Sequence, residues 1–310
     1  MTILINALLP IFALILLGAA LKAANFVSDE SWPGMERIAY YIFFPALMIQ
    51  SIYEADFGEL AAAQTAAGLF TGILIMLALM FVVRPLLQPA LGISSPSYSS
   101  LYQATTRWNA FIILAIAGEI AGPTGLTIVA IAIGAMVVPI NLVNIPVVAM
   151  LGDREGTRPH LLLQVIKNPL ILGVSAGLLL NFSGLKLTVP AETLLGLLAR
   201  ISLPLGLLLV GAGLKLRMPG GSLAAIATGT AIKLVLMPFV LGACAWLFGV
   251  RGQELMIVAL CGAGPSAMNG YLVAREMGGD APLFAALVTV QTAVAFATIP
   301  LVIAVAQWMG

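Results

Sequence analysis

The polar stretch Leu101-Tyr102-Gln103-Ala104-Thr105-Thr106-Arg107-Trp108-Asn109 lies in the middle of a long apolar run, where such side chains do not face lipid. A second interruption is Cys261-Gly262-Ala263-Gly264-Pro265-Ser266-Ala267-Met268-Asn269-Gly270, in which the proline lacks an amide donor and the glycines weaken a helix. Broken helices inside a membrane expose backbone groups that bind solutes. The two stretches predict interrupted transmembrane helices that cross near the midplane; the alternative is a pair of ordinary proline kinks.

The composition makes lipid the solvent of this chain. Of its 310 residues, 61% are hydrophobic and only 9% are charged, with a mean hydropathy of +1.09, whereas soluble domains average about 25% charged residues. A net charge of +1 gives no basic field for nucleic acid. The single histidine, His160, and the absence of a H-E-x-x-H motif argue against an intramembrane enzyme. We expect no metal centre and no cofactor.

Apolar runs of transmembrane length recur along the whole chain, separated by short polar breaks. Crossing the hydrocarbon core takes about 20 apolar residues. The sequence predicts an all-α polytopic membrane protein with ten transmembrane helices, the fourth and ninth of them broken. Their expected positions are about 3–21, 35–53, 60–82, 97–121, 125–150, 161–182, 191–213, 221–248, 253–274 and 282–308.

Lysine and arginine in the loops predict the orientation. With the N-terminus outside, only Lys186 and Arg251 lie in external loops. Nine basic residues then lie on the cytoplasmic side: Lys22, Arg37, Arg84, Arg154, Arg158, Lys167, Lys215, Arg217 and Arg275. We therefore expect both termini to be extracytoplasmic.

The two halves of the chain repeat each other at a spacing of 159 positions. This spacing relates Pro10 to Pro169, Gly18 to Gly177 and Pro45 to Pro204. Five helices per repeat is an odd number, so the second repeat enters the membrane from the opposite side. The sequence predicts a 5+5 inverted repeat, with residues 1–150 as the first half and 161–310 as the second.

Arg107 is the leading candidate for binding an anionic solute. A charge at mid-membrane costs roughly 2.5–3.5 kcal/mol, and its counterpart in the second repeat is Ser266. A guanidinium can bind a carboxylate with two parallel hydrogen bonds. Two other interpretations stay open: Arg107 caps free carbonyls of the broken helix, or it extends outward to the headgroups.

Other polar residues around the two interruptions complete the predicted binding site. The candidates are Arg107, Trp108, Asn109, Asn141, Pro265, Ser266, Asn269 and Gln291. Trp108 is mid-span, whereas Trp32, Trp246 and Trp308 lie at helix ends, where an aromatic belt belongs. Arg200 and Lys233 also fall within spans, and we expect structural pairing or extension toward the headgroups for them. One acidic residue, Glu119, lies well inside a predicted span, near the outer end of the fourth helix. The charge of the protein interior is therefore biased toward positive.

Two segments resemble the auxin efflux carrier family. They are Ile38-Ala39-Tyr40-Tyr41-Ile42-Phe43-Phe44-Pro45-Ala46-Leu47 and Pro265-Ser266-Ala267-Met268-Asn269-Gly270-Tyr271-Leu272-Val273-Ala274-Arg275, and the similarity continues through Thr298-Ile299-Pro300-Leu301. The resemblance implies crossed fourth and ninth helices at Asn109, Pro265 and Asn269. It also implies a scaffold of helices 1, 2, 6 and 7, often a dimer surface, and a moving transport bundle of helices 3–5 and 8–10.

The resemblance also sets the expected function. Family substrates are organic anions: indole-3-acetate in plants, with malate or malonate suggested for bacterial members. A compact bacterial permease of the cell inner membrane, a homodimer embedded in lipid, is expected. Members commonly carry a proline after the asparagine of the fourth helix; here the stretch reads Ile112-Ile113-Leu114-Ala115, so a softer break, or one centred on Thr105–Arg107, is expected.

The sequence thus predicts a secondary transporter that moves a small organic anion, a carboxylate, by alternating access. The main alternative is a sodium- or proton-coupled symporter or antiporter with the same architecture and another solute. Proton antiport usually needs acidic residues near the crossing, and helices 5 and 10 contain none. Sodium as a coupling ion stays open because carbonyl and amide oxygens can bind it.

Overall fold

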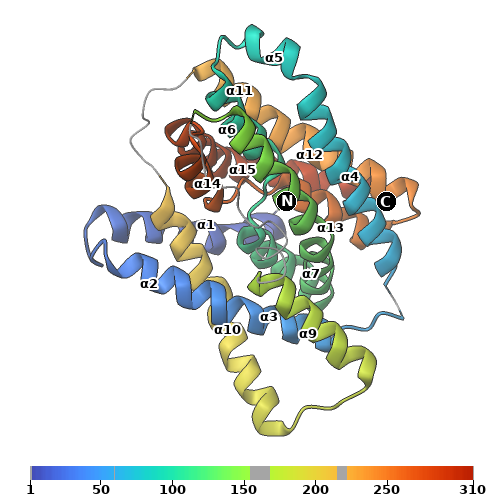
Figure 1. Ribbon diagram of the computed structural model, residues 1–310. Coiled ribbons are helices and arrows are strands. Elements are labelled where there is room, and N and C mark those ends of the chain that lie inside the picture. The colour runs from blue at the N-terminus through green and yellow to red at the C-terminus, as the bar shows by residue number, and fades with distance from the viewer. Residues whose placement is uncertain (1, 59, 154–167, 215–221, 310) are drawn as a thin grey trace.

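A computed structural model describes residues 2–58, 60–153, 168–214 and 222–309 (Figure 1). These described residues form helices and no strand. The helices are α1 (Thr2–Ala23), α2 (Ser31–Ile38), α3 (Phe44–Tyr53), α4 (Ala62–Val82), α5 (Arg84–Ala90), α6 (Ser95–Thr106), α7 (Ala110–Leu151), α9 (Pro169–Ser183), α10 (Val189–Gly213), α11 (Leu223–Ala231), α12 (Met237–Leu247), α13 (Gly252–Ala263), α14 (Asn269–Met277) and α15 (Ala281–Met309). Single π-helical turns, Ala39–Phe43 and Ile232–Leu236, join α2 to α3 and α11 to α12.

Several of these helices are long and apolar enough to cross a membrane. In the described part of the chain these are Ala62–Val82, Ser95–Leu151, Val189–Gly213, Leu223–Leu247 and Ala281–Trp308, and the shorter apolar helices are Leu8–Ala23, Pro169–Ser183 and Gly252–Ala263. The run Ser95–Leu151 has 57 residues and is interrupted within, so it has enough residues for more than one crossing. These helices confirm a helical membrane protein.

The structure agrees with the expected boundary between the fourth and fifth helices and adds one short helix that was not expected. The predicted boundary between the fourth and fifth helices is present: the range α7 consists of two helices that meet at Gly122, which leaves helical geometry with φ 55° and ψ −141°. A Cβ at Gly125 would lie 2.2 Å from the Ala117 carbonyl oxygen, so the bend is tight. The short helix α5 was not predicted. Residues 161–167 of the predicted sixth helix, and the basic residues Arg154, Arg158, Lys167, Lys215 and Arg217, lie outside the described residues.

The helices pack in two groups (Figure 1). In one group α1 packs on α10, α3 on α9, and α10 on α3. In the other, α4 packs on α12, α12 on α13, and α13 on α15, with α6 against α7 and α15. Helix α7 contacts members of both groups. The crossing of the broken helices lies within the second group, beside its boundary with the first.

Glycines let the helices of the first group approach through their backbones. A Cβ at Gly18 of α1 would lie 2.0 Å from the Leu208 carbonyl oxygen of α10, and a Cβ at Gly177 of α9 would lie 3.1 Å from the Ile49 carbonyl oxygen of α3. Gly18 and Gly177 are 159 positions apart, and so are Ile49 and Leu208. The α1–α10 and α3–α9 contacts therefore recur at the spacing of the sequence repeat.

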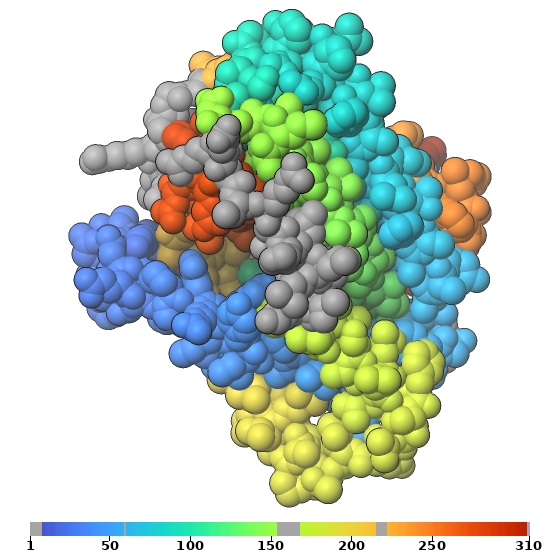
Figure 2. All heavy atoms as spheres, in the orientation of Figure 1, coloured from blue at the N-terminus to red at the C-terminus, as the bar shows by residue number. Residues whose placement is uncertain are grey.

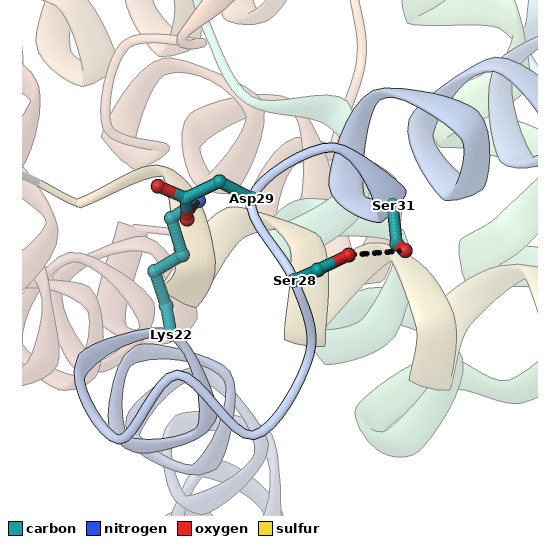
Figure 3. Close-up of polar contacts among 4 residues, drawn as sticks. All are labelled: Lys22, Ser28, Asp29 and Ser31. Atoms are coloured by element: carbon teal, nitrogen blue, oxygen red, sulfur yellow. Dashed lines mark hydrogen bonds and ion pairs between the residues drawn. The ribbon is translucent and has the colours of Figure 1, made fainter.

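Polar contacts hold the turn between α1 and α2 (Figure 3), which lies beside the buried Trp32. Lys22 Nζ lies 2.6 Å from Asp29 Oδ1, and the hydroxyls of Ser28 and Ser31 are 2.8 Å apart. The same ammonium lies 5.7 Å from the ring centroid of Trp32, which is only 5% exposed. Placing Trp32 in an aromatic belt was therefore wrong, because its ring packs inside the fold beneath Lys22.

We expect Gly18→Ala to destabilise the protein, because its Cβ would collide with the backbone of α10 rather than with a flexible side chain. Overpacking of this kind lowers the free energy of unfolding by roughly 1–3 kcal/mol, so the melting temperature in detergent should fall by several degrees. Gly34→Ala in α2 is the matched control, because a Cβ there meets nothing within 4 Å. A melting temperature of Gly18→Ala equal to that of Gly34→Ala would contradict the close approach.

Candidate functional site

The first interruption separates α6 from α7. Helix α6 ends at Thr106, Arg107 is extended with φ −74° and ψ 155°, and Asn109 is extended with φ −94° and ψ 98°. Asn109 Oδ1 accepts hydrogen bonds from the amides of Phe111 (3.1 Å) and Ile112 (3.3 Å), so Asn109 caps the start of α7. The break is therefore fully formed without the family's proline. It spans residues 107–109, so the expected centre at Thr105–Arg107 was placed slightly too early.

The second interruption meets the first directly. Helix α13 ends at Ala263, and α14 begins at Asn269. The Asn109 amide donates a 2.7 Å hydrogen bond to the Pro265 carbonyl oxygen. A Cβ at Gly264 would lie 2.7 Å from Ile113 Cγ1, so glycine is what allows this approach. The predicted crossing is present, and an interpretation as independent proline kinks is wrong.

Gln291 of α15 holds both interruptions together. Its Oε1 accepts from the Ser266 amide at 2.9 Å, and its Nε2 donates to the Ala104 carbonyl oxygen at 3.1 Å. The same nitrogen lies 3.5 Å from the Gly229 carbonyl oxygen of α11. Gln291 is fully buried. One side chain thus satisfies freed backbone groups from both broken helices, which water cannot do inside lipid.

Arg107 points into the protein and lacks an acidic partner. It is 4% exposed; its Nε donates to Gln103 Oε1 and its Nη1 to Asn141 Oδ1, each at 3.1 Å. Its Nη2 is buried without a hydrogen-bond partner, and no acidic side chain pairs with it among the described residues. Extension toward the headgroups was therefore a wrong alternative. Both of its hydrogen bonds go to side-chain amides and neither to a free carbonyl of the break.

Further unpartnered polar atoms lie on residues beside Arg107. Gln103 Nε2 and Asn144 Nδ2 are buried donors without an acceptor, and the Ser266 hydroxyl also lacks a partner. The oxygens of the same two amides do have partners. Gln103 Oε1 accepts from Arg107 Nε, and Asn144 Oδ1 accepts from the Thr106 hydroxyl at 3.1 Å. The oxygens of these amides are used while the N–H groups are left over. The crossing therefore has a surplus of donors, which is the requirement for binding an acceptor-rich solute.

The start of α14 adds positive potential at the same place. A Cβ at Gly270 would lie 3.1 Å from Arg107 Cδ, so the arginine side chain runs along the first turn of α14. This helix has no side-chain cap at its N-terminus, where the N–H groups carry a partial positive charge. Figure 2 shows the surface hollowed between α1–α3, in blue, and α14, in orange-red. Asn269, at the start of α14, is exposed.

The structure distributes the remaining candidates unequally. Trp108, Pro265 and Ser266 are buried at the crossing, and Asn141 is partly exposed and contacts Arg107. Arg200 is exposed, away from any described partner, whereas Lys233 is fully buried against the end of α13. Sequence reasoning did not single out Gln103 as the partner of Arg107. The available signal was their spacing of four residues, which places both on one face of a helix.

Two discontinuous helices that meet through their backbones, with polar groups gathered where they meet, define a class of protein: helical membrane transport proteins. The family described as "Membrane transport protein" matches residues 3–303. The chain belongs to this family, the membrane transporters of the auxin efflux carrier type. A comparison with curated proteins finds no match.

We expect Gln291→Leu to destabilise the crossing, because it leaves the Ser266 amide and the Ala104 carbonyl without partners. Each unpaired buried group costs about 1–3 kcal/mol, so the melting temperature should fall by several degrees without added ligand. Gln253→Leu is the control, since Gln253 is exposed at the start of α13. Equal melting temperatures for the two variants would show that Gln291 does not hold the break.

Proposed function

We propose that this chain is a secondary transporter that moves a small organic anion, a carboxylate, across the membrane by alternating access. One observation carries the proposal: Arg107 is buried with an unpartnered Nη2 beside the uncapped N-terminus of α14. A buried guanidinium without an anion nearby is costly. A solute carboxylate at this position would supply the missing negative charge and accept the free N–H groups.

The donors around the arginine favour a carboxylate over a neutral solute. A carboxylate has two oxygens and about four acceptor positions, and it has no donor of its own when ionised. Arg107 Nη2, Gln103 Nε2 and Asn144 Nδ2 present N–H groups without acceptors. The partial positive charge of the α14 N-terminus acts in the same direction. Trp108, buried at the crossing, offers a flat surface for a planar substrate.

An inverted repeat of five plus five helices, ten spans in all, is the architecture that we propose. It is supported by the paired Gly18–Leu208 and Gly177–Ile49 contacts. A third contact points the same way: the Ser202 hydroxyl donates to the Phe43 carbonyl oxygen, and these residues are 159 positions apart. A residue that bonds its own counterpart lies on the axis that relates the two halves. We further propose extracytoplasmic termini and a location in the cell inner membrane, from the loop charges.

Alternating access would move the second group of helices against the first. The two groups touch where Phe44 of α3 stacks on Phe111 of α7, with ring centroids 3.7 Å apart, and a Cβ at Gly206 of α10 would meet Phe44 at 2.6 Å. This contact lies just beyond the break, on the α7 side. The hollow of Figure 2 lies beside α14, whose C-terminal end we place on the cytoplasmic side because it carries Arg275. With the proposed orientation, the described state is open toward the cytoplasm. The first group would form the homodimer scaffold.

Arg107→Ala tests the site directly in proteoliposomes and in thermal-shift titrations with malonate, malate and indole-3-acetate. A lost hydrogen-bonded charge costs about 1.5–3 kcal/mol, so we expect binding of the transported anion to weaken roughly 10- to 150-fold. Arg107→Lys should recover only part of the affinity, because an ammonium lacks the planar pair of donors.

Arg200→Ala is the control for charge removal, because Arg200 is exposed on α10. It should keep the affinity and uptake of the unmodified protein. Should Arg107→Ala bind and transport every one of these anions as well as Arg200→Ala does, Arg107 would not belong to the binding site.

A further inference from the structure

Lys233 is a second buried cation near the crossing. It lies in the π-helical turn Ile232–Leu236 and is 0% exposed. Its Nζ donates to the Gly262 carbonyl oxygen at 3.2 Å and lies 2.7 Å from Met237 Sδ. Gly262 is in the last turn of α13, immediately before the second interruption. The ammonium therefore sits at the C-terminal end of a broken helix.

The local sequence places the Gly262 carbonyl beside this lysine. A Cβ at Gly262 would lie 2.4 Å from Pro238 Cα, so only glycine lets α13 approach α12 this closely. Pro238 has no amide hydrogen to donate to the turn before it, and the helix there is wound as a π-turn. These features bring Lys233 and the end of α13 together.

The fold itself does not require a cation here. The counterpart of Lys233 in the first repeat, 159 positions earlier, is Leu74, an exposed apolar residue. A buried ammonium needs acceptors for three N–H groups, and Lys233 has one carbonyl and one weakly accepting thioether. The partial negative charge at the C-terminal end of α13 offsets part of the free-energy cost of burying the Lys233 ammonium.

In transporters with broken helices, carbonyls at the C-terminal ends of half-helices are where coupling cations bind. We propose that the Lys233 ammonium is a tethered counter-ion that occupies such a cation position at the end of α13, so that the anion moves without a co-transported metal cation. This inference rests on the proposed function, because it concerns the same crossing. The proposal also implies a consequence for a variant without this side chain: a small free cation should then bind at the C-terminal end of α13.

The test compares anion uptake into proteoliposomes in sodium, potassium and choline buffers of equal ionic strength. The unmodified protein should transport at rates equal within about twofold in all three, and Lys233→Ala should fall at least about tenfold in choline. Methylammonium or sodium should restore part of that uptake and raise the melting temperature of Lys233→Ala relative to choline. Lys186→Met, at an exposed position, is the control and should be unaffected.

Three results would overturn the tethered counter-ion: uptake by the unmodified protein that requires sodium, full activity of Lys233→Ala in choline, or a folded Lys233→Ala that no cation activates or stabilises. If Lys233→Ala does not fold in any cation, the sodium dependence of the unmodified protein decides the question. Failure of the proposed function looks different: no carboxylate would be transported in any buffer. In that case the effect of cations on the melting temperature of Lys233→Ala still tests the cation site.

Discussion

The hydrogen bond from the Asn109 amide to the Pro265 carbonyl oxygen is the contact on which the rest of the site depends. A helix can be interrupted inside lipid only if the protein itself satisfies the freed backbone groups. Here each interruption satisfies part of the other, and the remaining groups are taken by the Asn109 side chain and by Gln291. Since most of the backbone needs are met in this way, the donors that stay without a partner belong to side chains, among them Arg107, Gln103 and Asn144.

The distribution of acidic residues explains why the centre is positive. Glu254 accepts from the Ala61 amide and the Thr65 hydroxyl at the start of α4, and Asp280 accepts from the Leu283 amide and the Ser97 hydroxyl. Both carboxylates thus act at helix N-termini, where a negative charge is favourable. Neither pairs with Arg107 or Lys233. The negative charges connect helix ends, while the two cations lie beside the interruptions.

Sequence reasoning located both interruptions because proline, glycine and polar residues in an apolar run have local consequences. It also predicted that Arg107 turns inward. It left open whether Asn109 caps a helix or binds substrate, although the cap is a local contact with Phe111 and Ile112. It could not identify Gln291 as the link between the breaks, because that role depends on distances between helices far apart in the chain. The same limit explains the wrong prediction for Trp32. Its position at a helix end indicated a lipid interface, whereas in the structure its ring is buried beneath Lys22.

The two groups of helices differ in the kind of contact that holds them. Within the first group, glycines Gly18 and Gly177 bring backbones together, and such contacts have no side chain that can adjust. Between the groups, the stack of Phe44 on Phe111 joins two side chains, each of which can change rotamer. The stack at the α7 boundary therefore consists of side chains that can adjust, whereas the first group is held by backbone contacts that cannot.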